Sequence, residues 1–546
     1  MHVGWLEILL LMLLQQAPAS APIASNLRIA GTAVDAISGA PVKEAAVFLT
    51  RGRTTVSVLT QLDGRFVFEH LEAGKYALSA RGKGYQVQAF NQHENFSTAI
   101  VVGDDQNTEN LLFRLSPAAS ISGQVADEFS EAVRDAQVML LWEGITNGRQ
   151  SVETRNETST DDKGQYRFTG LQPGRYYVAV SAQPWYAHNT LRPDGVSFGS
   201  TRGLQPITEQ NANLDVVYPV TYYPHETEAA RASMITLQPG SRATADLALQ
   251  PVPALHLRFA VRGADLHLPE GVGMQVGQQI LGGQPIFANG QIISRDKESI
   301  EVAGIPPGHL IVSLDMNADP ANRKGTRSVQ QQIDATRDGT VELTEIADDV
   351  AVSGKVEITG TVGFPDPAGI ALRSPETGSN YFANISKEGK NEFQIANVKP
   401  GSYNVIVENA PGFYIDKVQA FGATVSGNHL AIGSGAQVRL AVRIAQGLGR
   451  VEGVALRDAK PAAGVMILLI PNQSQNYPFR FRRDQSDSDG SFTLQQVLPG
   501  QYTLVAIENG WNQQWADPPV FKQWLSGGEV VQVAPNGKYT VKVKVQ

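Results

Sequence analysis

The chain has 546 residues, no cysteine, 52 glycines, 30 prolines and 42% hydrophobic residues. At roughly 100 to 200 residues per domain, this length predicts three to five domains, and the hydrophobic content excludes wholesale disorder. The absence of cysteine excludes thiolate metal sites, thiol nucleophiles, Fe–S clusters and a lipidated cysteine. The net charge of -8 is modest for this length and argues against a nucleic-acid-binding surface.

The N-terminus has the pattern of a signal peptide. Residues 6–14 are apolar except for Glu7, and a run of small residues follows at 17–21. An apolar run before an A-x-A site is typical of export, so residues 1–21 are predicted to be a signal peptide. The alternative is a buried N-terminal helix. No later stretch has the roughly 18 consecutive apolar residues of a membrane span, so we expect an exported protein that is periplasmic, cell-surface or secreted.

A short pattern recurs down the rest of the chain. Four copies open with a glycine in an apolar strand, at positions 31, 123, 354 and 453. A tight turn, a strand with apolar residues two apart, a Pro-Gly or similar turn and a Tyr-x-Leu or Tyr-x-Val strand follow. Asp-Gly suits a hairpin because glycine accepts a positive φ, and residues two apart on a strand share a face. The predicted turn residues are Asp63, Gly64, Gly74, Gly164, Pro173, Gly174, Pro400, Gly401, Asp489, Gly490, Pro499 and Gly500.

Two copies depart from this pattern. In the fourth copy the turn glycine is taken as Gly389, which stands 12 residues before Gly401, whereas the second and fifth copies have a spacing of 10. The third copy keeps only its second half. There, Glu298 stands in the place of the turn glycine and Phe259 in the place of the opening glycine.

Short strands, turn signals every 8 to 12 residues and the lack of a helical period predict β-sandwiches. We therefore expect an all-β fold, a tandem array of about five seven-stranded antiparallel β-sandwiches. The predicted units are a signal peptide at 1–21 and sandwiches at 27–116, at 118–250 with a Tyr/Pro-rich extension, at 251–346 in degenerate form, at 348–445, and at 447–546 with a Trp-rich tail.

The combined pattern G-x-V, D-G-x-F-x-F and L-x-P-G-x-Y resembles the carboxypeptidase regulatory-like domain, most completely in the first two copies. The resemblance implies a transthyretin-like (prealbumin-like) sandwich, similar to Cna-B-type domains and to modules of the carbohydrate-binding-like fold, in a multi-copy exported bacterial protein. It implies the fold strongly and the function weakly, because one fold serves many functions.

Aromatic residues gather in the extensions of the second and fifth copies. Rings with one exposed face suit the apolar faces of sugars, which would make a polysaccharide the partner. The alternative, which we favour, is that these rings pack over an open sandwich edge. The candidate ligand-binding residues are Trp185, Tyr222, Tyr223, Trp511 and Trp515.

A zinc peptidase is the enzyme that the family name suggests. The segment from His267 to Glu270 has the H-x-x-E form, with His309 or His429 as a third ligand. Pro269 lies between the two ligands, however, and no segment of about 300 residues is left for an α/β catalytic domain. No G-x-S-x-G elbow follows a strand and precedes a helix, and no P-loop occurs. We therefore expect no catalytic residue, no metal and no cofactor.

The acidic run in the fifth copy is a candidate calcium site. Asp484, Asp487 and Asp489 supply carboxylates at short spacing, but Gln485 and Gln496 occupy the first and last ligand positions of an EF-hand register. Turn formation explains the acidic residues equally well.

Two hypotheses of function follow. The first is a non-catalytic scaffold or adhesion module at the cell envelope, which offers loop tips or sheet edges to a polysaccharide or an envelope protein. The second is a metallocarboxypeptidase, or its accessory subunit, with a degenerate zinc site in the region 251–346.

Overall fold

The computed structural model describes residues 27–103, 106, 108–187, 213–261, 273–283, 285–288, 290–296, 298–316, 327–344, 346–359, 367–375, 378–386, 391–472 and 480–546. In these ranges the chain forms five β-sandwiches, numbered 1 to 5 in chain order, each with a buried hydrophobic cluster of its own. The all-β fold expected from the sequence is confirmed. The predicted signal peptide lies outside the described residues. No helix within the described ranges is both long and apolar enough to span a bilayer.

Sandwiches 1 and 2 each place two sheets face to face. The strands of sandwich 1 are β1 (Leu27–Asp35), β2 (Ala46–Arg51), β3 (Thr54–Leu59), β4 (Arg65–Leu71), β5 (Gly74–Arg81), β6 (Gln88–Ala89), β7 (Ile100–Val102) and β8 (Leu111–Leu115). Those of sandwich 2 and its extension are β9 (Ala119–Ala126), β10 (Gln137–Thr146), β11 (Arg149–Ser159), β12 (Gln165–Leu171), β13 (Gly174–Ser181), β14 (Val216–Val217), β15 (Thr221–Tyr222), β16 (Ile235–Leu237), β17 (Arg242–Thr244), β18 (Leu247–Ala248) and β19 (Val252–Pro253), with a 3-10 turn η2 (Ala229–Arg231).

Sandwiches 3 and 4 repeat this plan. The strands of sandwich 3 are β20 (Leu255–Val261), β21 (Gly273–Gln278), β22 (Ile286–Phe287), β23 (Gln291–Arg295), β24 (Ser299–Ile305), β25 (Gly308–Met316), β26 (Arg327–Ala335), β27 (Gly339–Leu343) and β28 (Ile346–Asp348). Those of sandwich 4 are β29 (Val350–Thr359), β30 (Gly369–Arg373), β31 (Asn380–Asn384), β32 (Glu392–Val398), β33 (Gly401–Glu408), β34 (Phe413–Phe421), β35 (Thr424–Ser426), β36 (His429–Ile432) and β37 (Val438–Gln446).

Sandwich 5 adds a short helical segment to the plan. Its strands are β38 (Gly449–Arg457), β39 (Lys460–Pro461), β40 (Met466–Pro471), β41 (Arg482–Gln485), β42 (Ser491–Val497), β43 (Gly500–Ile507), β44 (Glu529–Val533) and β45 (Lys538–Lys544). Between β43 and β44 lie η5 (Gly510–Asn512), α1 (Pro518–Phe521) and η6 (Lys522–Gly527).

The sheets are antiparallel apart from one recurring parallel pairing in each sandwich. The opening strand pairs in parallel with the closing strand in all five copies, as β1 does with β8 and β38 with β45. A parallel partner runs in the same direction, so the chain enters each sandwich near one end and leaves near the other. This arrangement lets one sandwich follow the next.

The opening glycine makes room for an aromatic ring on the neighbouring strand. Gly31 lies opposite Phe66, and a Cβ at Gly31 would lie 2.9 Å from that ring and 2.3 Å from the carbonyl oxygen of Leu111. In sandwich 3 the aromatic residue is on the opening strand instead: Phe259 holds the glycine position and lies opposite Ile300. Both Phe259 and Ile300 are buried. The aromatic ring has therefore moved to the opening strand, which explains how sandwich 3 keeps a core without the glycine.

The predicted Asp-Gly hairpin forms a different kind of connection. Gly64 does have a positive φ of 77°. The strands on either side, β3 and β4, however, belong to opposite sheets of sandwich 1. The carbonyl of Gly64 accepts a hydrogen bond from the backbone N–H of Ala33 at 2.9 Å. The turn therefore carries the chain between the two sheets and attaches it to the opening strand.

In the fourth copy, Asn391 rather than Gly389 occupies the equivalent turn position. Asn391 has a φ of 66°, and its carbonyl accepts a hydrogen bond from Val356 at 2.8 Å, as Gly64 does from Ala33. Gly389 lies outside the described residues. Asparagine tolerates the left-handed region better than most residues do, and Asn391 restores the spacing of 10 to Gly401.

The turn before the Tyr-x-Leu or Tyr-x-Val strand is tied down by that tyrosine. In four sandwiches its hydroxyl donates a hydrogen bond to the carbonyl four residues earlier, as Tyr176 does to Gln172 and Tyr502 to Leu498. Burial raises the pKa of both Tyr176 and Tyr502, so they remain neutral donors. Sandwich 3 has Leu310 at this position and lacks the bond.

Strands β10 and β40 are buried on both faces. In β10, Val138 and Leu140 point into the core of sandwich 2, while Met139 and Leu141 join a second cluster with Ile280 of sandwich 3. Every residue of β40 is buried. A continuous apolar run is the sequence signal for such a strand, because both faces then need an apolar partner.

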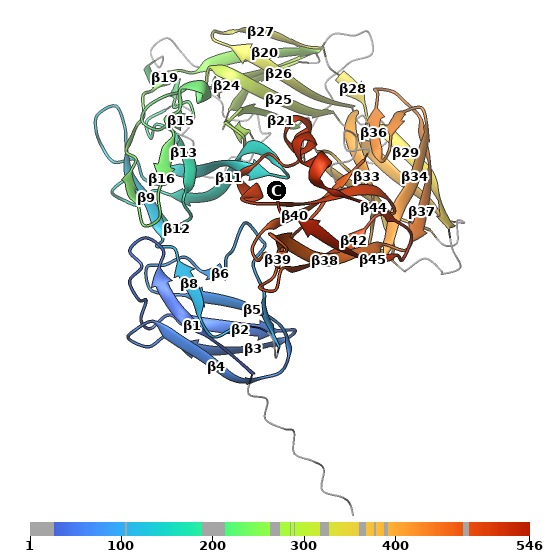
Figure 1. Cartoon of the computed structure of the whole chain (residues 1–546). Coiled ribbons are helices and arrows are strands. Elements are labelled where there is room, and N and C mark those ends of the chain that lie inside the picture. Colours follow the sequence, from blue (N-terminus) through green and yellow to red (C-terminus); the bar gives the residue numbers. More distant parts are fainter. Residues whose placement is uncertain are drawn as a thin grey trace, which may run out of the picture.

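The last sandwich folds back against the first two. In Figure 1, sandwiches 2 to 5 lie around the C-terminal residue, and sandwich 1 lies below them. Sandwich 5 contacts sandwich 1, where Arg483 pairs with Glu94, and sandwich 2, where Ala516 donates to the carbonyl of Gly148. The chain is therefore a folded-back cluster rather than an extended string.

Candidate functional site

Of the five candidate ligand-binding aromatics, Trp511 and Trp515 are buried in the structure. They are 6% and 5% exposed and belong to a cluster with Phe481, Phe521 and Trp524. This cluster covers the outer face of the sheet formed by β40 and β43. Neither indole offers a free ring face, so the expectation that these two tryptophans form a sugar platform does not fit the structure. They pack on the outer face of this sheet, whereas the alternative drawn from the sequence places them over an open sandwich edge.

Tyr222 and Tyr223 also serve the packing of the sandwiches. Tyr222 is buried between sandwiches 2 and 3, and its hydroxyl accepts a hydrogen bond from the backbone N–H of Leu281 at 3.0 Å. Burial raises the pKa of Tyr222. Tyr223 is partly buried against the core of sandwich 2, with its N–H bonded to the carbonyl of Val178. Both residues therefore belong to the body of the molecule.

Trp185 is the one exposed ring among the five candidates. It is 74% exposed, and its neighbour Tyr186 donates a hydrogen bond to Glu128. Burial and this bond raise the pKa of Tyr186 to about 12. The residue after Glu128 is Phe129, which is 70% exposed and which the sequence reasoning missed. The Glu128–Tyr186 bond thus brings the segments that carry two exposed aromatic rings to the same end of sandwich 2.

A turn of sandwich 5 docks on sandwich 1, more than 380 residues away in sequence. We call residues 485–491 the docking turn. Asp487 accepts hydrogen bonds from the Lys75 ammonium and from the backbone N–H of Ala99, the latter at 3.1 Å. Ser488 donates its N–H to the carbonyl of Ala99 at 2.9 Å and accepts from the N–H of Val101 at 2.8 Å.

Gln485 lies at the buried start of this turn and is 1% exposed. Its side-chain NH₂ donates to the carbonyl of Asn91 at 2.7 Å and to the hydroxyl of Thr98 at 2.9 Å. Its Oε1 lies 3.0 Å from Nδ1 of His93. Because a buried amide that lacks its partners is costly, this set of bonds fixes the position of sandwich 1.

Arg483 joins the polar and aromatic parts of the same interface. Its guanidinium makes a two-pronged contact with Glu94 at 2.8 and 3.0 Å and lies over the ring of Trp515, 4.1 Å from the centroid. A planar guanidinium can pair with a carboxylate at its edge while it stacks with its face. Phe96 of sandwich 1 lies against Trp511 in the same cluster.

The acidic run considered as a calcium site is used in folding and docking. Asp487 faces Lys75 across the interface, and Asp489 accepts a hydrogen bond from Ser491 in its own turn. Asp484 accepts from the N–H of Thr493 at 2.7 Å, and burial raises its pKa. Within the described ranges, no group of three or more His, Asp or Glu residues converges so as to hold a metal.

Of the residues proposed as a zinc site, only the two candidates for the third ligand lie within the described residues. His267 and Glu270 lie outside the described residues. His309 faces Asp334 in sandwich 3 and is largely exposed, whereas His429 lies near Asn404 in sandwich 4.

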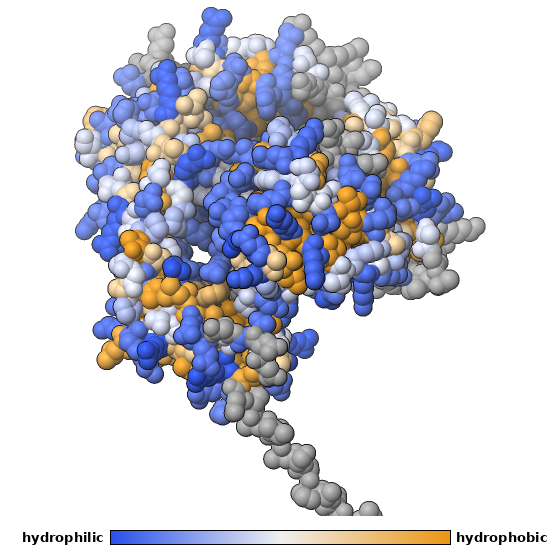
Figure 2. All heavy atoms as spheres, in the orientation of Figure 1, coloured by the Kyte–Doolittle hydropathy of each residue, from blue (hydrophilic) through white to orange (hydrophobic). Residues whose placement is uncertain are grey.

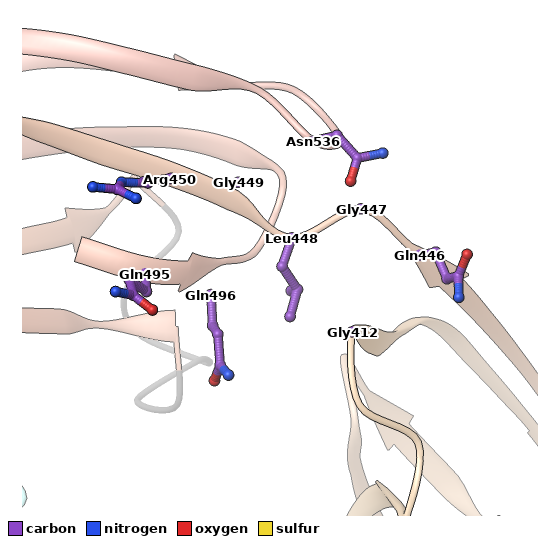
Figure 3. Close-up of a pocket in the computed structure, with 9 residues that line it drawn as sticks. All are labelled: Gly412, Gln446, Gly447, Leu448, Gly449, Arg450, Gln495, Gln496 and Asn536. Atoms are coloured by element: carbon purple, nitrogen blue, oxygen red, sulfur yellow. The ribbon is translucent and has the colours of Figure 1, made fainter. Parts of the chain in front are cut away.

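A pocket of about 470 Å³ lies at the joint between sandwiches 4 and 5. Figure 3 shows Leu448, on the linker, pointing into the space between Gln496 and Gly412. The lining offers neutral amides, and its one charged side chain, Arg450, pairs with Glu452 at 2.7 Å. The pocket can therefore form hydrogen bonds but supplies no acid, base or nucleophile. Its nine lining residues are Gly412, Gln446, Gly447, Leu448, Gly449, Arg450, Gln495, Gln496 and Asn536.

Comparison with protein families bears on the first part of the chain. The family model described as the carboxypeptidase regulatory-like domain matches residues 28–116 and 120–197. The first two sandwiches are therefore similar to carboxypeptidase regulatory-like domains. The resemblance seen in the sequence is thus confirmed for these two copies, and the shared strand pairings extend the same plan to sandwiches 3 to 5.

Individual relatives are distant. Serine-aspartate repeat-containing protein D of Staphylococcus aureus (strain Newman) is 23% identical over 164 residues, a match that covers 28% of this chain and only 12% of that protein. Among solved structures, the Bacillus anthracis TIE protein covers 95% of this chain and 68% of its own at 11% identity and a TM-score of 0.16. A streptococcal ancillary pilin covers 54% of this chain and 99% of its own at 10% identity and a TM-score of 0.19. Such low scores carry no conclusion about function.

Proposed function

We propose that this chain is a non-catalytic, exported scaffold of the cell envelope, in which five sandwiches form one closed body that presents its loops and sheet edges to a partner. The observation that carries this proposal is the docking turn of sandwich 5 on sandwich 1. Gln485 and Asp487 of this turn, together with Arg483 just before it, use their polar groups to hold two sandwiches together. Polar side chains of the types used in catalysis or metal binding are instead engaged in contacts between sandwiches.

Closure gives the scaffold a fixed geometry. Sandwiches joined only by linkers would move relative to one another, because interfaces between domains are usually small and polar. Here the cluster around Trp511 gathers residues from three sandwiches, with Phe96 from sandwich 1 and Ile145 from sandwich 2. Surfaces on different sandwiches are therefore held at constant distances, which suits a protein that spaces or presents partners.

The closed body is tested by small-angle X-ray scattering on the full chain. A compact chain of this size has a radius of gyration of about 24 Å, whereas an extended string of five sandwiches has a much larger one. We expect a value near the compact limit. A rod-like scattering profile would contradict the proposal.

The partner class is tested by binding purified chain to isolated cell envelopes that have been divided into protein and polysaccharide fractions. Saturable binding to either fraction supports the scaffold. The peptidase alternative is tested in parallel by zinc analysis and a carboxypeptidase assay. Stoichiometric zinc and activity that both disappear in His267→Ala would replace the scaffold by the enzyme.

Carbohydrate binding at sandwich 2 is a second candidate, and the exposure of Trp185 and Phe129 favours it. Exposed rings held on a rigid end of a sandwich can stack on the apolar faces of sugars. On a glycan array, Trp185→Ala and Phe129→Ala should each weaken binding about tenfold, in keeping with roughly 1.4 kcal/mol per stacked ring. Phe421→Ala, at a similarly exposed ring of sandwich 4, is the matched control. Equal binding by all three variants would dismiss this site.

A further inference from the structure

Strand β3 forms an open and uncharged edge of sandwich 1. Within the part of the chain that the structure describes, it is the end strand of the sheet β3-β2-β5-β6 and pairs with β2 on one side only. Five of its six residues are exposed, and Val56 is 48% exposed. In Figure 1, β3 lies on the side of β2 away from β5, and β5 lies nearer to sandwich 5. Figure 2 shows that hydrophobic residues reach the surface of sandwich 1.

The composition of this edge favours pairing with another strand. Residues 54–62 read TTVSVLTQL, without a charge, proline or glycine. Leu62, just after the strand, is 82% exposed. Soluble proteins usually protect an edge strand with charged residues, proline, bulges or a covering segment, because the free N–H and C=O groups otherwise recruit a further strand. Strand β3 contains neither a charged residue nor a proline.

The equivalent edges of sandwiches 2 and 5 are protected. Strand β11, the end strand in sandwich 2, carries Arg149, Glu153, Arg155 and Glu157. Strand β41, the end strand in sandwich 5, is short and charged, and sandwich 1 covers it through the contact of Arg483 with Glu94. The unprotected edge of β3 therefore differs from the equivalent edges of sandwiches 2 and 5.

We propose that β3 pairs antiparallel with β3 of a second copy of this chain, so that the two sheets join into one. An extended, uncharged segment rich in β-branched residues would pair well with this edge. Strand β3 is itself such a segment. Antiparallel pairing about a two-fold axis also keeps like charges apart, because Arg53 at the start of one strand lies beside the uncharged end of the other, at Leu59 and Thr60. This self-association is separate from the closure within each chain and from any envelope partner.

The test measures the mass of the full chain by sedimentation velocity over a range of concentrations. We expect a concentration-dependent doubling of mass for the natural chain. Val56→Lys and Val56→Glu should each abolish the dimer, because each places two like charges close together at the joint. An equimolar mixture of the two variants should restore it, since the charges are then opposite.

Val530→Lys is the matched control, because Val530 is an exposed valine on another end strand, β44 of sandwich 5. It should leave the dimer intact. Thermal unfolding of both Val56 variants should match that of the natural chain, as expected for an exposed site. A natural chain that stays monomeric overturns the proposal, and so does a dimer that persists in both Val56 variants.

Discussion

The imidazole of His93 lies flat against the indole of Trp511, with ring centroids 5.4 Å apart and planes inclined by 7°. The two residues stand in the first and last sandwiches, so this stacked pair marks the place where the chain closes. Around it lie the Arg483–Glu94 pair and the hydrogen bonds of Gln485. Apolar burial stabilises the contact, and the buried polar groups specify its geometry.

Truncation of Trp511 should open the body. Trp511→Ala removes a buried ring from a cluster shared by three sandwiches, and such changes typically cost about 3–5 kcal/mol. We expect a lower free energy of unfolding in denaturant and a larger radius of gyration. Trp185→Ala, at an exposed indole, is the control and should change neither quantity. Equal behaviour of the two variants would show that the cluster does not hold the sandwiches together.

The carboxylate of Asp487 should contribute more than that of Asp489 to the docking of sandwich 5 on sandwich 1. Asp487 is bonded to Lys75 and Ala99 across the interface, whereas Asp489 is bonded to Ser491 of its own turn. Asp487→Ala should therefore destabilise the docked arrangement by about 1.5–3 kcal/mol, the range for hydrogen bonds to charged groups. Limited proteolysis and scattering would detect the release of sandwich 1. An expansion of similar size in Asp489→Ala would argue against a specific role for Asp487.

Two substitutions can move the aromatic ring of sandwich 3 from the opening strand β20 to its partner strand β24. Phe259→Gly should cost at least about 3–5 kcal/mol, because it leaves a cavity in the core. Ile300→Phe alone should cost about 1–3 kcal/mol through overpacking. The double variant recreates the Gly31–Phe66 arrangement of sandwich 1, so it should be more stable than the sum of the single effects allows. Strictly additive effects in denaturant unfolding would contradict the exchange.

The pair His256–Asp215 should make stability depend on pH. The two side chains lie 2.7 Å apart where the extension of sandwich 2 meets sandwich 3, and the hydrogen bond to Asp215 raises the pKa of His256. A raised pKa in the folded state means that the stabilisation is complete below the unfolded value of about 6.5 and is lost as the pH rises through the folded value. His256→Gln should flatten this part of the profile of unfolding free energy against pH. A variant that keeps the natural slope would show that another group titrates.

Much of each sandwich could be predicted because its signals are local. Gly64 takes a positive φ, and the tyrosines after the Pro-Gly and similar turns point inward, for reasons contained within a few residues. Asn391 was missed because asparagine can replace glycine in the left-handed region, so the letter changes while the conformation does not. The prediction of a hairpin at Gly64 was wrong because a turn signal does not specify which sheet the next strand joins.

The roles of the aromatic residues could not be predicted in the same way. Trp185 and Trp511 have the same side chain and both follow a strand that opens with the Pro-Gly turn, yet one is exposed and the other buried. Trp511 is buried by the helical segment and sheet of its own sandwich together with His93 and Phe96 of sandwich 1. The continuous apolar run in β40 was the available sign that both faces of this sheet would be covered.

Local patterns along the chain specify the all-β class and the repeated sandwich, because turn preferences and two-residue periodicity act over short distances. Contacts between distant segments specify which strands pair in parallel, that sandwich 5 closes onto sandwich 1, and which sheet edges stay open. These depend on contacts between residues as far apart as His93 and Trp511, where complementary shape and paired polar groups matter and no local pattern records them.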